Sequence, residues 1–252
     1  MSEKKGGTIS IAGYGFEYPA HFNKAIDNVL TTCDIIFYSA LNANIKKHIV
    51  EMSKRSVEIL IHRGERADAV CMKYIMWGNK INGYRHDGLN VGIVTYGNPI
   101  KFCNIAQIFA LYSNDRVSKM VPGISLTDCL LSDLKVSIKH GVQAYEITNA
   151  ISNRPHITKS TPIIFTNVGV FSPTQSLQQL ETIHMINVST VTPLRTYLKS
   201  HFGFTHNVSI TLYWPGDGVN PTYICKTTAD DLTRDQIPPL CALLLYDSHV
   251  EH

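Results

Sequence analysis

The sequence predicts an α/β fold of two lobes, with a mostly parallel sheet in the first lobe and a mixed sheet in the second. In the first half, short apolar runs alternate with segments whose apolar residues recur at helical spacing. This alternation is typical of parallel strands joined by crossover helices. The second half has four strand-like runs and one clear helical stretch, which indicates a mixed sheet. We predict that the first lobe covers residues 1–121 and the second covers residues 122–252.

The elements of the first half of the chain follow one another regularly. The first helix is indicated by apolar residues that all fall on one face of a helix, namely Phe22, Ala25, Ile26, Val29, Leu30 and Cys33. Another helix is predicted to start at Ser125, because Asp128 three residues later completes a capping-box signature. Strands are expected over residues 8–12, 34–38, 57–61, 91–96 and 117–121, and helices over residues 22–33, 69–80, 102–110 and 125–134.

The second lobe has fewer helical signals. Apolar runs predict strands over residues 163–168, 208–214, 222–225 and 240–246. The only clear helical pattern among them covers residues 194–201. A 252-residue chain is long enough to give both lobes a core.

Composition excludes several classes of protein. Apolar residues make up 44% of the chain and charged residues 17%, which is ordinary for a globular protein. The net charge is +3, and no basic stripe interleaves with aromatic residues, so nucleic-acid binding is not expected. No run approaches the roughly 18 apolar residues of a membrane span. The polar N-terminus has no apolar segment of the kind found in signal peptides.

Cysteine and histidine spacing argues against metal sites and disulfides. The six cysteines form no Cys-x-x-Cys pair, so neither a zinc site nor a disulfide framework is expected. A reducing, cytoplasmic location is the simplest interpretation. The eleven histidines form neither His-x-x-x-His nor His-Glu-x-x-His, and we predict no metal. No Gly-x-Ser-x-Gly elbow indicates a nucleophilic triad.

Three predicted strands end in loops rich in glycine and proline. These loops are Gly13-Tyr14-Gly15, Tyr96-Gly97-Asn98-Pro99 and Pro122-Gly123-Ile124-Ser125. Ligands of open α/β sheets bind beyond the carboxyl ends of the strands, and glycine lets a backbone turn sharply or approach a ligand. Each loop by itself is a weak signal, and a Gly-x-Gly after a strand is more often a plain turn than a binding site. The first loop lacks the third glycine of a dinucleotide fingerprint and has no phosphate-binding lysine, which excludes Rossmann and P-loop sites.

Taken in order, the three loops resemble those of the tetrapyrrole-methylase superfamily. That superfamily has a glycine-rich first loop, a Gly-Asp-Pro-like turn and a Pro-Gly-Ile-Ser turn. Residues 121–134 and 141–146 look like the borosin branch, which methylates backbone amides of a peptide. Tyr96-Gly97-Asn98-Pro99 likewise looks like the Tyr-Gly-His-Pro of that branch, with Asn98 in place of histidine. The resemblance covers most of the chain and weakens after about Phe171.

The resemblance implies a homodimer of two-lobed, tetrapyrrole-methylase-like subunits. Each subunit would hold S-adenosylmethionine in the cleft between its lobes. Phe102 could equally be a core residue of its helix. The positions that match the cofactor site of the family are Gly13, Tyr14, Gly15, Tyr96, Gly97, Asn98, Pro99, Lys101, Phe102, Ser125, Leu126 and Asn167.

The resemblance also implies a catalytic tyrosine. Tyr74 lies 22 residues before Tyr96, which is the spacing of an active-site tyrosine in borosins. The lone pair of an amide nitrogen is delocalised, so removing its proton or stabilising an imidate-like state must help methylation. A tyrosinate, or a Tyr–Arg pair, could supply this help, and Tyr96 is a second candidate. Tyr74 could otherwise be an ordinary tyrosine on a half-buried helix.

The segment before Tyr74 departs from the family pattern. Borosins have an arginine one turn before this tyrosine and another tyrosine further upstream, where this chain has Val70 and Gly64. Arg63 and Arg66 could replace the missing arginine, or they could be solvated surface residues. A catalytically degenerate module that binds the cofactor or a peptide is therefore one alternative function.

The C-terminal sequence bears on the substrate. Fused borosins carry their peptide as a C-terminal extension, whereas this chain ends shortly after its last predicted strand without a Gly- or Val-rich tail. We therefore expect a separate precursor peptide, as in split members of that family. A small-molecule methylase of the tetrapyrrole kind is the other alternative function.

Overall fold

The computed structural model describes residues 6–59, 67–101, 117–158, 161–170, 191–202, 209–238 and 240–245. Contacts divide these residues into two compact units. The first unit is built from residues 6–59, 72–101, 117–126 and 216–221, and the second from the other described residues. The loop over residues 216–221 therefore joins the first unit although the chain on both sides of it belongs to the second.

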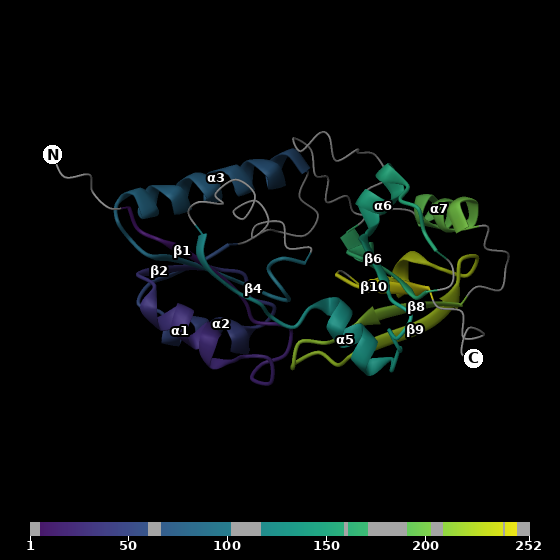
Figure 1. Cartoon of the computed structure of the whole chain (residues 1–252), viewed down its shortest axis with the longest axis horizontal. Coiled ribbons are helices and arrows are strands. Elements are labelled where there is room, and N and C mark those ends of the chain that lie inside the picture. Colours follow the sequence, from purple (N-terminus) through teal and green to yellow (C-terminus); the bar gives the residue numbers. More distant parts are fainter. Residues whose placement is uncertain are drawn as a thin grey trace. The chain divides into compact units, whose positions relative to one another are not determined.

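The first unit contains a five-stranded parallel sheet (Figure 1). Its strands lie in the order β3 (Ser56–Glu58), β2 (Ile35–Tyr38), β4 (Val91–Thr95), β1 (Ile9–Gly13) and β5 (Val117–Val121). Every neighbouring pair is parallel. The predicted parallel N-terminal sheet is thus confirmed, and the carboxyl ends of β4, β1 and β5 are adjacent at one edge.

Helices cover both faces of this sheet. α1 (Lys24–Thr32) and α2 (Ala43–Met52) lie on one face, and α3 (Ala67–His86) lies on the other (Figure 1). Successive side chains of a strand point to opposite faces, so β2 contributes to two separate cores. Phe37 belongs to the core under α3, where its ring centroid lies 5.9 Å from that of Trp77, whereas Ile36 belongs to the core under α1 and α2.

Asparagine side chains set where α1 and α2 begin. α1 was predicted from residue 22 but starts at Lys24, because Asn23 is its N-cap, and its side-chain oxygen accepts hydrogen bonds from the backbone N–H groups of Ala25 and Ile26. α2 was not predicted. Asn42 caps it, and Ile45 and Ile49, four residues apart, are its buried face. That cap and that spacing are the sequence signals of this short helix.

The loop over residues 216–221 is tied to the start of α2. The backbone carbonyl oxygen of Asp217 accepts a hydrogen bond of 2.7 Å from Nδ2 of Asn42. The Asp217 carboxylate is buried and accepts hydrogen bonds from the backbone N–H groups of Val219 and Asn220 and from the Asn220 side chain. Burial alone would raise the pKa of this carboxyl, but the hydrogen bonds from Asn220 and Val219 outweigh it and hold the pKa below its ordinary value.

The second unit contains a mixed five-stranded sheet. Its order is β6 (Gln143–Glu146), β7 (Ile163–Thr166), β10 (Ala242–Leu245), β8 (Ser209–Trp214) and β9 (Tyr223–Thr228). β6 and β7 are parallel, and the other neighbouring pairs are antiparallel. The predicted mixed sheet is confirmed. β6 and the helix after it were not predicted, because their short segments lack a clear apolar period.

One face of the second sheet carries the core of this unit. α6 (Ile147–Asn153) and α7 (Thr192–Phe202) pack there, with Leu198 and Phe165 fully buried between layers (Figure 1). On the other face, the buried Tyr213 hydroxyl donates a hydrogen bond to Asp133 at the end of α5 (Leu126–Asp133). Short 3₁₀ helices cover Val168–Val170 and Arg234–Gln236.

The strand predicted over residues 163–168 is shorter in the structure. β7 ends at Thr166, because Asn167 has a φ of 60° and lies in the left-handed region. Asparagine tolerates this conformation better than most residues, since its short polar side chain can bond locally. The backbone then enters the 3₁₀ helix that begins at Val168.

Candidate functional site

The three glycine-containing loops of the first unit meet at the carboxyl ends of β1, β4 and β5. The first two loops are joined by backbone hydrogen bonds, beginning with one from Tyr14 N–H to the carbonyl oxygen of Thr95 (2.9 Å). Gly15 and Gly97 then exchange two more, Gly15 N–H to Gly97 O at 3.2 Å and Gly97 N–H to Gly15 O at 2.7 Å. These bonds add one antiparallel bridge beyond the ends of β1 and β4, so backbone hydrogen bonds join the two loops directly.

Three glycines let the loops come into backbone contact. A Cβ at Gly13 would lie 2.3 Å from the carbonyl oxygen of Gly97. A Cβ at Gly123 would lie 2.2 Å from the same oxygen and 2.5 Å from the carbonyl oxygen of Gly13. No side chain fits at either position without moving backbone. We call Gly13, Gly97 and Gly123 the glycine junction; Gly97 also has a positive φ of 64°, which glycine adopts without strain.

Polar side chains join the second and third loops beside this junction. The Lys101 ammonium group donates a hydrogen bond of 3.3 Å to Oγ of the buried Ser125. The second loop is itself a tight turn, in which the Asn98 side chain accepts from Ile100 N–H (3.0 Å) and the Asn98 carbonyl accepts from Lys101 N–H (3.0 Å). Three predicted site residues therefore place polar groups beside the glycine junction: the hydroxyl of Ser125, the ammonium group of Lys101 and the amide of Asn98.

Tyr14 has its side chain in the core. Its ring is fully buried and stacks on Phe22 at a centroid distance of 5.2 Å. Its hydroxyl donates to the carbonyl oxygen of Ser39 (2.9 Å) and accepts from Leu41 N–H (3.2 Å). The side chain thus fixes the segment that follows β2, and only the backbone of Tyr14 is left for a ligand.

Tyr96 immediately follows β4, which ends at Thr95, one residue before the predicted end at Tyr96. Its side chain is half-buried and packs against the core cluster under α1 and α2. The Tyr96 and Phe16 ring centroids are 6.3 Å apart. Tyr96 at the start of the second loop therefore lies beside the residue that follows the first loop, while Pro99 at the far end of the second loop is buried.

The other predicted site residues fall in three groups. Leu126 is the first residue of α5, and Asn167 follows β7 in the second unit; both are half-buried. Tyr74 is a position of α3, and its side chain lies outside the described part of the structure. Arg63, Arg66 and Phe102 lie outside the described residues.

The segment after the first loop contains a histidine that sequence reasoning missed. Nδ1 of His21 accepts hydrogen bonds from the backbone N–H groups of Phe16 (3.0 Å) and Glu17 (3.1 Å). A contact of a side chain with the backbone four or five residues before it leaves no periodic pattern. The sequence therefore gives no signal for it.

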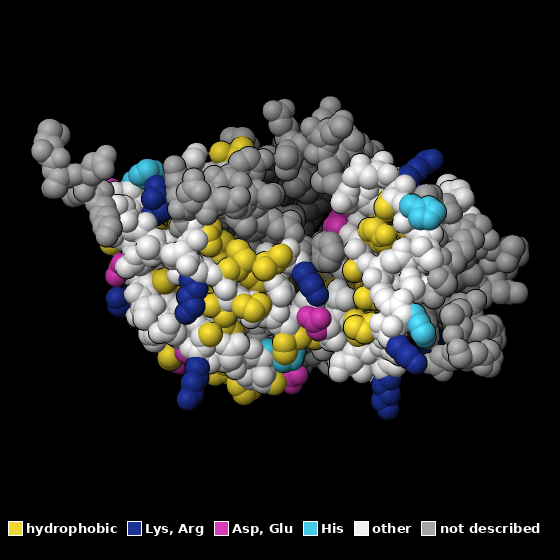
Figure 2. Space-filling model, viewed as in Figure 1, with side chains coloured by type: hydrophobic (Ala, Val, Ile, Leu, Met, Phe, Trp, Pro, Cys, Tyr) yellow, Lys and Arg dark blue, Asp and Glu magenta, His cyan; other side chains and the backbone are white. Residues whose placement is uncertain are grey.

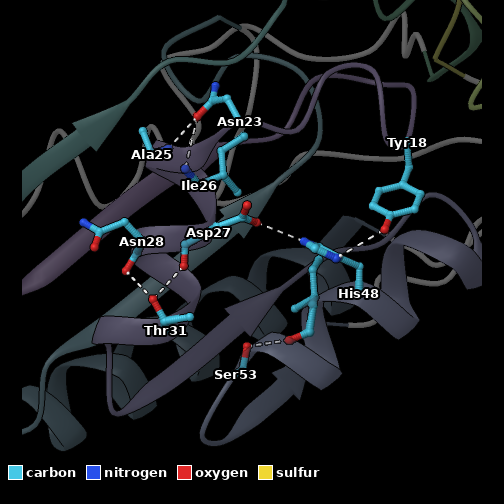
Figure 3. A network of polar contacts seen from close by, with 10 residues as sticks. Tyr18, Asn23, Ala25, Ile26, Asp27, Asn28, Thr31, His48 and Ser53 are labelled. Atoms are coloured by element: carbon cyan, nitrogen blue, oxygen red, sulfur yellow. Dashed lines mark hydrogen bonds and ion pairs between the residues drawn. The ribbon is translucent and has the colours of Figure 1, made fainter.

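A second histidine holds the far end of the same segment. In Figure 3, His48 lies between Tyr18 and Asp27, with its Nε2 atom 3.0 Å from an Asp27 oxygen and its Nδ1 atom 3.4 Å from the Tyr18 hydroxyl. The rings of Tyr18 and Phe22 lie 5.1 and 4.9 Å from the His48 ring. The His48–Asp27 contact thus joins α2 to α1, and the segment packs on α2 through the contacts of Tyr18 and Phe22 with the His48 ring.

The surface around the described loops is partly apolar. Ile100 is 61% exposed and Ile124 is 40% exposed, and each belongs to one of the loops that form the glycine junction. On the face shown in Figure 2, hydrophobic side chains gather on part of the first unit, and Lys and Arg side chains are scattered rather than aligned. Among the described residues, no helix is long and apolar enough to cross a membrane, and no three or more His, Cys, Asp or Glu gather as metal ligands.

Comparison with known sequences gives relatives of one kind. No family model matches the chain. The chain is 24% identical over 174 residues to a methyltransferase/ribosomally synthesized cyclic peptide gymnopeptides precursor of Gymnopus fusipes, which covers 67% of this chain and 40% of the relative. It is 24% identical over 248 residues to a methyltransferase/ribosomally synthesized type I borosin cyclic peptide precursor of Cerrena unicolor, covering 94% of this chain and 57% of the relative. The chain thus spans about half the length of these relatives.

Comparison with solved structures identifies the fold. A uroporphyrin-III-C-methyltransferase from Thermus thermophilus superimposes with a TM-score of 0.57 at 14% identity, covering 95% of this chain and 91% of that chain. The methyltransferase CobJ gives a TM-score of 0.56 at 12% identity, covering 96% and 95%. The predicted fold class is confirmed: this chain has the α/β fold of the tetrapyrrole methyltransferases.

Proposed function

We propose that the protein is an S-adenosylmethionine-dependent methyltransferase whose cofactor binds at the glycine junction. The observation that carries the proposal is the meeting of three strand-end loops at the carboxyl edge of a parallel sheet, where ligands of such sheets bind. The sequence relatives and the structural neighbours support it, because all carry the name methyltransferase.

The side chains at the junction suit this cofactor. S-adenosylmethionine offers a carboxylate, an ammonium group, ribose hydroxyls and a flat purine. The Lys101 ammonium group fits the carboxylate, the Ser125 hydroxyl fits a polar group, and the Tyr96 ring offers a flat apolar face. Backbone groups of the first and second loops, with Leu126 and Asn167, complete the proposed set. When bound, the cofactor supplies an electrophilic methyl group on its sulfonium.

We further propose that the acceptor is a backbone amide of a peptide supplied by a separate chain. The relatives support a peptide, because their names join a methyltransferase to a cyclic-peptide precursor. The separate chain follows the resemblance to split members of the family. In this proposal Tyr74 removes the amide proton, with Arg63 or Arg66 stabilising negative charge on the amide oxygen.

One set of assays tests these proposals and separates the alternatives. Isothermal calorimetry should show binding of S-adenosylmethionine and of its demethylated product, and absence of both would refute the central proposal. Labelled cofactor is then supplied with either a Val/Ile-rich peptide or a corrinoid precursor. Mass gains of one methylene per site on the peptide support peptide N-methylation. Transfer to the corrinoid instead would favour the tetrapyrrole-type alternative that the fold allows, and binding without transfer would favour a degenerate module.

The proposed homodimer is tested by a separate measurement. We expect a homodimer in the cytoplasm, as the resemblance implies. Light scattering coupled to size-exclusion chromatography should give twice the mass of the 28.2 kDa chain. A monomer at micromolar concentration would contradict the dimer.

A further inference from the structure

We propose that His21 is a positioning residue that fixes the first loop for cofactor binding. The inference rests on the proposed function, since it takes the glycine junction as the cofactor site. His21 acts through the backbone of the loop. It is therefore distinct from the residues proposed to contact the cofactor.

The hydrogen bonds of His21 define which ring nitrogen carries the proton. Nδ1 accepts from two backbone N–H groups, those of Phe16 and Glu17, so in the neutral ring the proton lies on Nε2. Both donors directly follow Gly15 along the chain. Without an acceptor at this place, the N–H of the buried Phe16 and the N–H of the exposed Glu17 would each lose this hydrogen bond.

The ring also fits the space next to Gly15. A Cβ at Gly15 would lie 2.7 Å from Cβ and 2.8 Å from Nδ1 of His21, and Gly15 has a φ of 75°. Any side chain at position 15 would therefore clash with His21 in this conformation, so this position has to be glycine. Gly15 in turn exchanges two backbone hydrogen bonds with Gly97. A continuous chain of contacts thus runs from His21 through Gly15 to the glycine junction.

Other contacts hold the remainder of the segment independently. His21 N–H bonds to the Glu17 carbonyl (2.9 Å), and Phe22 N–H bonds to the Pro19 carbonyl (3.0 Å). Tyr18 and Phe22 are held by the His48 ring. Removing the His21 imidazole should therefore release the part of the loop next to Gly15 without unfolding the whole segment.

Two substitutions at His21 and one matched control test the proposal. His21→Ala removes the acceptor, whereas His21→Asn keeps an acceptor oxygen close to the position of Nδ1. Asn23→Ala is the control, because Asn23 Oδ1 also accepts from two backbone N–H groups, at 2.9 and 3.2 Å, but these belong to α1 (Figure 3). The dissociation constant for S-adenosylmethionine is measured by calorimetry, and the turnover number is measured at saturating cofactor.

We expect His21→Ala to weaken cofactor binding about tenfold, which corresponds to about 1.4 kcal/mol. Turnover at saturating cofactor should stay within about twofold, because the chemistry is untouched once the loop is ordered by the cofactor. His21→Asn should restore binding to within about threefold of wild type. Asn23→Ala should bind as wild type does, although it removes the N-cap of α1.

A spectroscopic measurement gives a second, independent test. The ¹⁵N shifts of the neutral His21 ring in the wild-type protein should report a proton on Nε2 and none on Nδ1. The opposite tautomer, or wild-type binding by His21→Ala, would overturn the inference. So would equal weakening in the Ala and Asn variants when both are folded. If the wild-type protein binds neither the cofactor nor its product, the proposed function itself fails, which is a different result.

Discussion

The glycine junction predicts that Gly123→Ala damages the first unit through contact alone. The new Cβ would lie 2.2 Å from the carbonyl oxygen of Gly97 and 2.5 Å from that of Gly13. A carbon atom and a carbonyl oxygen normally stay about 3.3 Å or more apart, so each backbone would have to move by about 1 Å. Both oxygens belong to main chain, so a change of side-chain rotamer cannot relieve the clash. We expect a loss of about 3 kcal/mol, the upper part of the usual range for overpacking.

The same chain supplies a control with the opposite expected sign. Gly83 lies inside α3, and a Cβ there would meet no atom within 4 Å. Gly83→Ala should therefore stabilise the protein by about 0.5–1 kcal/mol, because alanine loses less backbone entropy in a helix. Two identical chemical changes are thus expected to act in opposite directions, and the surroundings of each glycine set the direction.

Urea unfolding measures both variants, with a fluorescence signal that reports on the first unit. The chain has two tryptophans, Trp77 in α3 of the first unit and Trp214 in the second. In a Trp214→Phe background, the fluorescence change therefore follows the first unit. Calorimetry on the same variants should show cofactor binding lost in Gly123→Ala and retained in Gly83→Ala. If Gly123→Ala unfolds at the wild-type urea concentration and binds cofactor normally, the described contact of the three loops is wrong.

Three further predictions concern single side chains. Tyr14→Phe keeps the buried ring but leaves the Ser39 carbonyl and the Leu41 N–H without the bridging hydroxyl, so urea unfolding should show a loss of about 1–3 kcal/mol; an unchanged midpoint would show that water replaces the hydroxyl. The pKa of Asp217 is lowered in the folded protein, so the unfolded chain binds more protons; its stabilising contribution is present above the unfolded pKa of about 3.9 and is lost as the pH falls through the lower folded pKa. Asp217→Ala should therefore flatten the dependence of stability on pH below about pH 4, and an equally steep acid dependence would contradict the assignment. Tyr74→Phe should lower the rate of methyl transfer by about 100-fold if Tyr74 is the general base, with cofactor affinity unchanged, whereas full activity would make Tyr74 structural.

The sequence was sufficient for the features that have local signals. β1, β2 and β4 are short, largely apolar runs, and glycine- or proline-containing loops follow β1, β4 and β5, so these strands and loops could be predicted from neighbours in the chain. The meeting of Gly13, Gly97 and Gly123 followed from the general geometry of parallel sheets. The sequence did not reveal why these positions are glycines, which is that the backbones of the loops contact one another.

Features that depend on tertiary contacts could not be predicted. The resemblance assigns Tyr14 to the cofactor site, but it does not reveal that the Tyr14 side chain lies in the core and bonds to the segment after β2. His21 acts on backbone groups that carry no sequence information. Asn167 shortened β7 through one backbone angle, which an apolar run does not reveal. In each case the contact or backbone angle that determines the structure leaves no mark on the local pattern of apolar residues and glycines.

The shared carbonyl of Gly97 has a consequence for engineering and for divergence among related chains. Since this one oxygen contacts both Gly13 and Gly123, the backbone path of each loop depends on the backbone paths of the other two. Grafting one loop from a related enzyme should fail unless the other two are transplanted with it. A helix position such as Gly83, where an added Cβ would meet no atom within 4 Å, carries no such constraint, so we expect such positions to diverge while the three loops are inherited as a single block.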